Sequence, residues 1–211
     1  MLRRALIAGL PVLITGCVVI EHQTVLPDSN AGTVAAGAPE PAATPLHQGA
    51  TSLAPAYDDE AKDFGVPPIN TIRVGDYEAP TPTHVAGATT ITTRQLRDMM
   101  LSSRPPLLID VLDGNQTVSL PGAIWLRGAG LGSGLDDQVQ AKLGARLAAL
   151  TDGDKEKPVV FFCLSKTCWL SHNATVRALA LGYSKVYWYR GGRNAWRAAG
   201  LELDPVSNSV F

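Results

Sequence analysis

The spacing of apolar positions changes partway along the chain. Before about Asp76 the apolar residues follow no regular period, whereas afterwards short apolar runs alternate with segments in which apolar side chains recur every three or four positions. The short runs predict strands at residues 88–92, 105–112, 122–126, 157–163 and 185–189. The helical spacing predicts helices at residues 92–103, 136–151, 169–183 and 192–200. This alternation predicts an α/β domain with a mainly parallel sheet flanked by helices.

Capping residues mark the ends of these predicted helices. Thr92 or Thr93 can accept a hydrogen bond from the N–H groups that open the first helix. The acidic pair at residues 136–137 suits the positive end of the second helix. Gly182 and Gly200 are placed to end the third and the last helix.

Residues 1–16 have the pattern of a secretory signal peptide. Two arginines precede an apolar run at residues 5–14, which is shorter than the roughly 18 to 20 residues that a membrane-spanning helix needs. The segment ends in "LITGC", which resembles the lipobox of bacterial lipoproteins. That resemblance implies cleavage before Cys17 and lipidation of the new N-terminus. An ordinary signal peptide with an incidental cysteine is the alternative.

Residues 17–72 are predicted to form a flexible linker from the lipid anchor to a domain at residues 73–211. The segment is rich in Ala, Gly, Pro, Ser and Thr, so it cannot bury enough apolar surface to offset the entropy of ordering. The lipoprotein resemblance also implies the outer membrane of a Gram-negative cell, because Val18 rather than an aspartate follows the lipid cysteine. We therefore expect a periplasmic protein anchored to the membrane through the lipid on Cys17.

Charge excludes one class of partner. The formal net charge is -1 and 18% of the residues are charged, so no basic field is present to hold a nucleic acid.

Lipidation of Cys17 would leave Cys163 and Cys168 as the remaining thiols in an oxidising compartment, where they can pair with each other or with an external group. A zinc site needs four ligands, and only His172 lies near the two cysteines in the sequence. We predict no metal and no cofactor.

Cys163 occupies a position that suits a nucleophile. It ends a predicted central strand, and ligands of parallel α/β folds bind at that edge of the sheet, where N–H groups at helix starts converge. A cation in the following loop would favour the thiolate of Cys163 and lower its pKa. Cys168 could then act as a resolving cysteine, and a purely structural disulfide is the alternative. The loop between the two cysteines consists of Leu164, Ser165, Lys166 and Thr167.

Other side chains receive supporting roles. Trp169 is predicted to pack in the core or at its rim, with lining of the pocket beside Cys168 as the alternative, and Asp110 to orient loops at the end of its strand. His172 either faces the cysteines one turn into its helix or lies on a solvated face. Arg177 is predicted to form a surface ion pair, and Arg190 to be solvated.

Several segments together resemble a rhodanese domain: "LLIDVL", "LPGAIWL", "KPVVFFC" and "ALALGYSKVYWYRGGRNAWRAAGLEL". The resemblance implies a catalytic cysteine at Cys163, a loop that cradles a persulfide, and a glycine pair followed by a helix that carries Trp196. More narrowly, "VGDYEAPTP" and "CWLSHNATVRALALGYSKVYWYRGG" resemble the exported PQQ-dependent catabolism-associated CXXCW motif proteins. That branch implies an association with PQQ-dependent alcohol oxidation and an exported quinoprotein or cytochrome partner. Here four residues, not two, separate the cysteines.

Two hypotheses about function follow. In the first, the chain is an exported sulfurtransferase or thiol–disulfide protein that uses Cys163 as nucleophile and Cys168 as resolving cysteine. Its substrate would be a small sulfur donor or a thiol protein. In the second, the chain is a catalytically inactive rhodanese-like binding module, and the two cysteines form a structural disulfide.

Overall fold

The computed structural model describes residues 59–207, 209 and 211. The predicted signal peptide, the predicted lipidation site Cys17 and most of the predicted linker lie outside these residues. Within the described part of the chain, no helix has the length and apolar character needed to cross a membrane.

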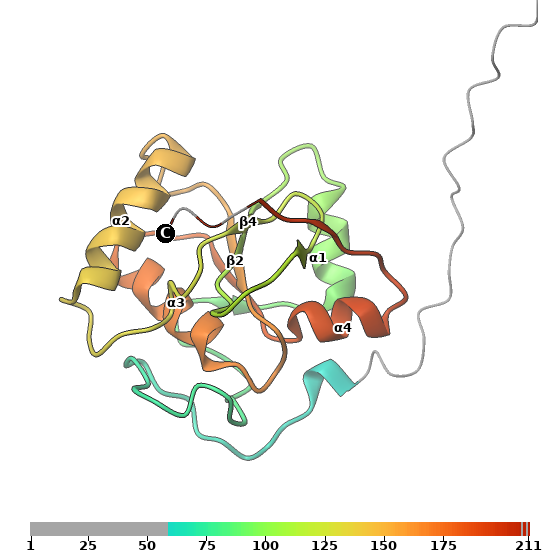
Figure 1. The fold of residues 1–211 in the computed structure, drawn as a ribbon, viewed down its shortest axis with the longest axis horizontal. Helices are drawn as coiled ribbons and strands as arrows, with labels where there is room; N and C mark the ends of the chain where they lie inside the picture. Colours follow the sequence, from blue (N-terminus) through green and yellow to red (C-terminus); the bar gives the residue numbers. More distant parts are fainter. Residues whose placement is uncertain (1–58, 208, 210) are drawn as a thin grey trace, which may run out of the picture. The chain divides into compact units, whose positions relative to one another are not determined.

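A parallel sheet of five strands forms the centre of the described fold (Figure 1). The strand order is β1-β6-β5-β2-β4, and all four neighbouring pairs are parallel. The mainly parallel sheet predicted from the alternating pattern is therefore confirmed. The strands are β1 (Thr89–Thr90), β2 (Leu107–Asp110), β4 (Ile124–Trp125), β5 (Val159–Phe162) and β6 (Val186–Tyr189). A separate antiparallel pair, β3 (Val118–Ser119) with β7 (Asp204–Pro205), was not predicted.

Helices cover both faces of the sheet, as predicted. One hydrophobic cluster joins Phe161 of β5 to residues of α2 and α3, and a second joins Phe162 of β5 to residues of α1 and α4. The two phenylalanines point to opposite faces because successive strand side chains alternate. All four residues of β5 are buried, as expected for a strand covered on both sides. The helices are α1 (Thr93–Met100), α2 (Gln138–Thr151), α3 (Trp169–Ala180) and α4 (Gly192–Ala198).

The predicted caps are present at the helix ends. Thr92 caps α1 and forms a capping box with Gln95. Asp137 caps α2 by accepting a hydrogen bond from the N–H of Gln140. Gly182, which follows α3, has a positive φ of 85°, a conformation that glycine adopts without steric cost.

The segment before β1 differs from the prediction. Residues 59–72 were assigned to the flexible linker, but Glu60 is buried and accepts hydrogen bonds from the backbone N–H and the hydroxyl of Thr93, at 2.9 and 2.7 Å. Asp59 pairs with Lys166. The predicted domain boundary at residue 73 is therefore too late. The segment is held mainly by polar and backbone contacts, which leave no apolar periodicity in the sequence.

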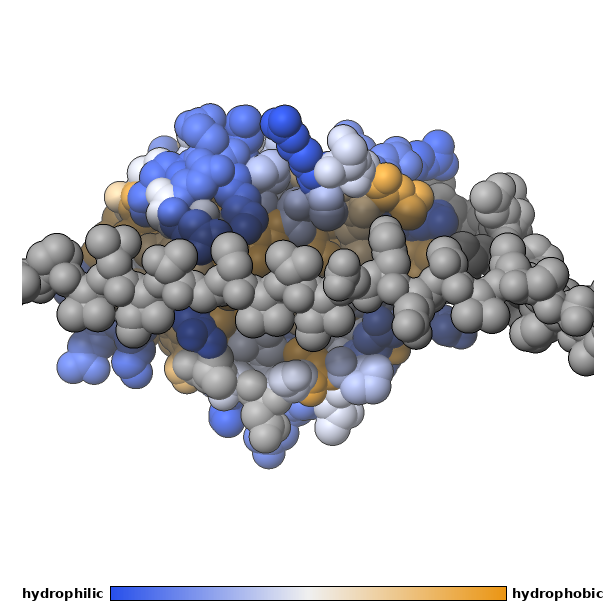
Figure 2. Space-filling view, turned by 90° about the horizontal axis from the view of Figure 1, so that it is seen from above, coloured by the Kyte–Doolittle hydropathy of each residue, from blue (hydrophilic) through white to orange (hydrophobic). Residues whose placement is uncertain are grey.

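Hydrophobic side chains are not confined to the interior. In Figure 2 the visible described surface carries mostly hydrophilic side chains with smaller hydrophobic areas among them. Among the described residues, the large exposed apolar side chains are Val74, Leu101, Leu135 and Leu164. Leu164 is the one that belongs to the loop between the cysteines.

Candidate functional site

The two cysteines connect the central strand to a helix. Cys163 directly follows β5, and Cys168 is the residue that precedes the first turn of α3. Their sulfur atoms are joined in a disulfide. Both residues are buried, with exposed fractions of 1% for Cys163 and 6% for Cys168. The site residues predicted on either side of the loop are thus brought together.

The start of α4 holds the beginning of the loop. The backbone N–H of Arg193 donates to the carbonyl of Cys163 at 3.1 Å, and that of Asn194 donates to the carbonyl of Leu164 at 2.9 Å. Gly192 has a φ of 61°, and a Cβ at this position would lie 2.5 Å from the carbonyl oxygen of Cys163. Glycine is required here because the loop backbone approaches so closely.

A segment at residues 77–81, which we call the strap, crosses the other end of the loop. Glu78 forms an antiparallel bridge with Cys168. The backbone N–H of Trp169 donates to the carbonyl of Tyr77 at 2.8 Å, and the indole N–H donates to the carbonyl of Pro80 at 3.1 Å. Trp169 is fixed under the strap by these two hydrogen bonds, with 1% of its surface exposed.

The predicted sources of thiolate stabilisation are in part engaged elsewhere. The N–H groups of Thr167 and Cys168 donate to the hydroxyl and the carbonyl of Ser165, at 3.2 and 3.0 Å. The first N–H of α3 is occupied by the strap. Lys166 pairs with Asp59 and also donates to its carbonyl at 2.9 Å. The cation expected to act on Cys163 is therefore directed to the segment that precedes the strap.

Asp110, predicted to orient loops at its strand end, has a carboxylate that contacts the turn after β2. It ends β2 and lies beside Phe162, the residue before Cys163, in the strand register. Its carboxylate accepts hydrogen bonds from the N–H of Leu112 at 3.0 Å, the hydroxyl of Ser119 at 2.5 Å and the amide of Gln116 at 3.2 Å. Burial raises the pKa of Asp110, although these hydrogen bonds and Arg193 act in the opposite direction. The carboxyl group ties the turn after β2 to the strand edge.

His172 does not lie on a solvated face. Its ring is fully buried and meets the rings of Trp169 and Trp188 edge-on, with centroid distances of 4.7 and 5.7 Å. Burial lowers the pKa of His172 to about 4. The imidazole is therefore neutral at neutral pH and acts as a packing group.

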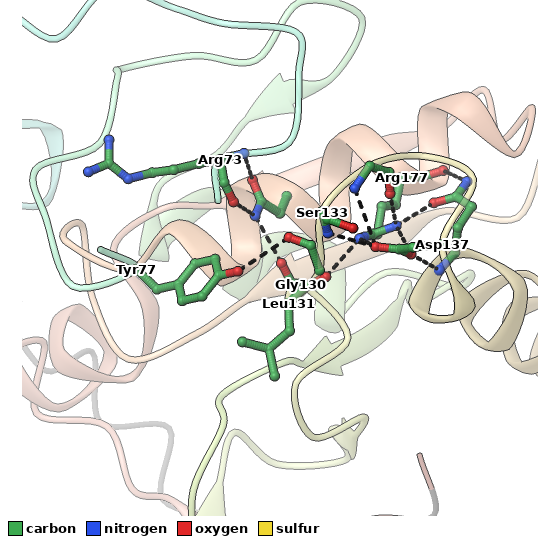
Figure 3. A network of polar contacts seen from close by, with 11 residues as sticks. Arg73, Tyr77, Gly130, Leu131, Ser133, Asp137 and Arg177 are labelled. Atoms are coloured by element: carbon green, nitrogen blue, oxygen red, sulfur yellow. Dashed lines mark hydrogen bonds and ion pairs between the residues drawn. The ribbon is translucent and has the colours of Figure 1, made fainter. Parts of the chain in front are cut away.

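Two arginines that were predicted to lie at the surface, Arg177 in an ion pair and Arg190 solvated, are buried. Arg177 is fully buried and donates to both carboxylate oxygens of Asp137, at 2.9 and 2.8 Å, and to the carbonyl of Leu131 at 2.7 Å (Figure 3). Partial burial opposes ionisation of Asp137, but the hydrogen bonds from Arg177 and the backbone hold the pKa of that carboxyl well below its usual range. Arg190 donates to the hydroxyl of Thr81 at 2.9 Å and to backbone carbonyls. The sequence prediction was wrong for both side chains.

Asn173 of α3 connects two segments that the sequence did not associate. Its amide donates to the carbonyls of Arg73 and Gly130, each at 2.9 Å, and its side-chain oxygen accepts from the N–H of Arg73 at 3.0 Å. In Figure 3 the tyrosine of the strap, Tyr77, reaches the same region, and its hydroxyl donates to the carbonyl of Gly132 at 3.4 Å. These contacts fix the strap and residues 130–132 relative to α3.

A cavity of about 620 Å³ opens between these segments. Among the described residues, Cys168 lines this cavity and Cys163 does not. Sequence reasoning missed the cavity, although the quoted segment "VGDYEAPTP" contains part of its wall. The other lining residues are Arg73, Asp76, Tyr77, Glu78, Ala79, Leu112, Asp113, Leu131, Leu164, Ser165, Thr167 and Leu170.

Metal binding finds no support in the described part of the chain. There, no group of three or more His, Cys, Asp or Glu side chains is arranged to hold an ion. The chemistry that the site offers is that of two sulfur atoms and a buried carboxyl group.

Comparison with solved structures concerns the fold alone. A protein from Lactobacillus plantarum has a TM-score of 0.41 and 19% identity, over 53% of this chain and 82% of its own. A polysulfide-sulfur transferase from Wolinella succinogenes has the same two values, over 58% of this chain and 82% of its own. An anaerobic ergothioneine biosynthesis enzyme from Chlorobium limicola has a TM-score of 0.40 and 18% identity, over 56% of this chain and 32% of its own.

Comparison by sequence identifies the family. No curated protein matches the chain. The model of the rhodanese-like domain matches residues 92–199, just over half of the 211 residues. The match begins at the cap of α1 and ends directly after α4, so it contains both cysteines and the whole parallel sheet except β1. The chain belongs to the family of proteins with a rhodanese-like domain.

Proposed function

We propose that this protein transfers sulfur or exchanges disulfides with thiol substrates, with Cys163 as nucleophile and Cys168 as resolving cysteine. One observation carries the proposal: a disulfide joins the residue that ends the central strand to the residue that begins the next helix. A nucleophile at the carboxyl end of a parallel strand has access to the ligand-binding edge of the sheet. The second sulfur lies within bonding distance of the first.

The proposed reaction has two steps. The thiolate of Cys163 attacks the outer sulfur of a persulfide, releasing the donor as a thiolate and leaving a persulfide on Cys163. The thiolate of Cys168 then attacks the inner sulfur of that persulfide, which forms the Cys163–Cys168 disulfide and expels hydrosulfide. A disulfide donor would react in the same way, with a second thiolate as the leaving group. Leu164, the residue after Cys163, is exposed, so the loop between the two cysteines borders solvent.

Mass mapping of the reduced protein tests this assignment of roles. We expect alkylation at mildly acidic pH to label Cys163 before Cys168, because the deprotonated thiol is the reactive form. Cys168→Ser should accumulate a persulfide on Cys163 when a low-molecular-mass persulfide is added, whereas Cys163→Ser should capture no sulfur. Equal labelling of both thiols, or sulfur capture by Cys163→Ser, would contradict the proposal.

The proposal includes export and membrane anchoring through a lipid on Cys17. The sequence "LITGC" supports lipidation, and the intact mass of the protein isolated from membranes would test it.

The proposal also includes a role beside PQQ-dependent alcohol oxidation, with an exported quinoprotein or cytochrome as partner. The segments "VGDYEAPTP" and "CWLSHNATVRALALGYSKVYWYRGG" support this association. Co-purification of such a partner from cells grown on an alcohol would test it.

A second function is favoured by one specific observation. Both cysteines are buried in the disulfide form, which suits a structural link in an inactive binding module. This alternative predicts that the folded protein keeps its disulfide in the presence of a thiol reductant and accepts no sulfur.

A further inference from the structure

The two cysteines of the disulfide lie differently with respect to the cavity. Both belong to the hydrophobic core, but Cys163 is 1% exposed and the close approach of Gly192 covers its carbonyl group. Cys168 is 6% exposed and forms part of the wall of the 620 Å³ cavity. A thiolate that breaks a disulfide must reach one of the two sulfur atoms. A thiol that enters this cavity meets Cys168 and not Cys163 among the described lining residues.

The charges around the cavity select among thiols. Three carboxylates line it, those of Asp76, Glu78 and Asp113, against the single cation of Arg73 among the described lining residues. Asp76 is paired with Arg73 at 3.9 Å and Asp113 with Arg127 at 3.1 Å, so Glu78 supplies the excess negative charge of the described lining. The guanidinium of Arg73 also lies 4.7 Å from the centre of the Trp169 ring. This excess charge disfavours an anionic substrate.

The cations near the cysteine loop do not alter this balance. Lys166 pairs with Asp59, and the guanidinium of Arg190 donates to Thr81 and to the carbonyl of Lys62. Arg193 donates to the carbonyl of Val118 at 2.6 Å. Each of these side chains is held by its own contacts within the fold, so none of these cations in the described part of the chain is left to bind an incoming sulfur oxyanion such as thiosulfate.

The remaining wall of the cavity is apolar. Leu112, Leu131, Leu164 and Leu170 contribute aliphatic side chains to it. A cavity of about 620 Å³ is within the range of ligand sites and has room for more than a free thiol group. The combination suits a cysteine side chain presented by a peptide, with apolar or basic neighbours.

We infer that Cys168 is the sulfur attacked when a thiol substrate re-reduces the disulfide, and that this substrate is a peptide or protein cysteine without negative charge around it. The inference rests on the proposed function. It names the class of thiol substrate that reduces the Cys163–Cys168 disulfide after that reaction. The substrate thiolate forms a bond to the sulfur of Cys168, the Cys163–Cys168 bond breaks, and Cys163 leaves as a thiolate. A second substrate thiolate then attacks the substrate sulfur of the mixed disulfide and releases Cys168. Two thiols are oxidised to one disulfide, and the protein disulfide is reduced.

Three small thiols of different charge test this inference on the oxidised full chain. The probes are cysteamine, 2-mercaptoethanol and thioglycolate, each compared with its own rate towards a small neutral disulfide. After a rapid acid quench, alkylation and peptide mapping should locate the probe on Cys168 and the alkyl group on Cys163. Relative to the reference disulfide, cysteamine should react faster than thioglycolate by on the order of fivefold, as expected for a difference of two unit charges about 8 Å from one carboxylate in water.

Two matched variants separate charge selection from general effects. Glu78→Gln removes an exposed carboxylate of the cavity and should reduce the ratio of the cysteamine rate to the thioglycolate rate. Asp98→Asn removes an exposed carboxylate on α1 and should leave that ratio unchanged.

Each of the remaining outcomes would contradict a specific part of the inference. Probe recovered on Cys163 would overturn the role of Cys168 while leaving the proposed function intact. Equal normalised rates for the three probes, or a ratio that Glu78→Gln does not change, would overturn the substrate class. A disulfide that none of the probes can break would overturn both the inference and the proposed function.

Discussion

The ring of His172 lies between the rings of Trp169 and Trp188, at centroid distances of 4.7 and 5.7 Å, and burial lowers its pKa to about 4. Its position one turn after Cys168 left open whether it faces the cysteines or lies on a solvated face. The sequence gives the spacing between His172 and the cysteines, whereas the tryptophan of β6 that encloses it comes from a distant segment. The place of Asp110 at the end of β2 was predictable, because the apolar run before it marks a buried strand.

The lowered pKa of His172 makes stability depend on pH. Between pH 6.5 and about 4 the unfolded chain binds a proton at His172 that the folded protein does not. The free energy of unfolding should therefore be highest above pH 6.5 and fall by up to about 3 kcal/mol as the pH decreases to 4. His172→Phe keeps a ring between Trp169 and Trp188 and should flatten this dependence, measured by urea unfolding of the oxidised protein at several pH values. The exposed His84 provides the control, because His84→Gln should retain the parental pH profile. A His172→Phe profile as steep as that of the parent would contradict the prediction.

At the scale of elements, the sequence predicted the pattern and missed the connections between segments. The five strands and four helices follow from apolar spacing, which reports burial against a sheet. The strap and the pair of β3 and β7 escaped prediction because they are held by backbone hydrogen bonds that leave no periodicity. Arg177 was misjudged for a related reason: its partners lie some 40 positions away, at Leu131, Asp137 and Gln140. Position in a helix does not reveal such contacts.

The buried pair of Arg177 and Asp137 should contribute to stability in a way that an exposed pair does not. Arg177→Met leaves the carboxylate of Asp137 without its cation and releases residues 131–134 from α3. We expect the free energy of unfolding to fall by about 3 kcal/mol. The exposed pair of Arg127 and Asp113 provides the control, since Arg127→Met should cost less than about 1 kcal/mol.

A second substitution distinguishes loss of the ion pair from loss of packing. Adding Asp137→Asn to Arg177→Met removes the unpaired charge but retains an oxygen that can cap α2. The double variant should recover part of the lost stability in chemical denaturation. Additive losses in the double variant would show that packing, not the charge pair, carries the effect.

At the scale of the whole molecule, the structured domain starts earlier than composition suggested. The carboxylate of Glu60 binds the first N–H of α1, Asp59 binds the loop between the cysteines through Lys166, and Arg190 reaches the carbonyls of Glu60 and Lys62. The N-terminal segment therefore contacts the loop between the cysteines through Lys166. The contacts of Asp59 and Glu60 therefore tie the chain that follows the proposed membrane anchor to the cysteine loop and to α1.

Two truncated chains measure what this segment contributes. A chain that begins at Asp59 keeps all of these contacts, whereas a chain that begins at Arg73 loses them and keeps the strap. We expect the shorter chain to unfold at lower urea concentration, with a loss of about 2 kcal/mol, because the N–H of Thr93 and the guanidinium of Arg190 lose partners. Its disulfide should also react faster with 2-mercaptoethanol, since Lys166 no longer fixes the loop to Asp59. Limited proteolysis of the full chain should leave a core that starts near residue 59, and a core that starts near residue 73 with undiminished stability would restore the boundary predicted from composition.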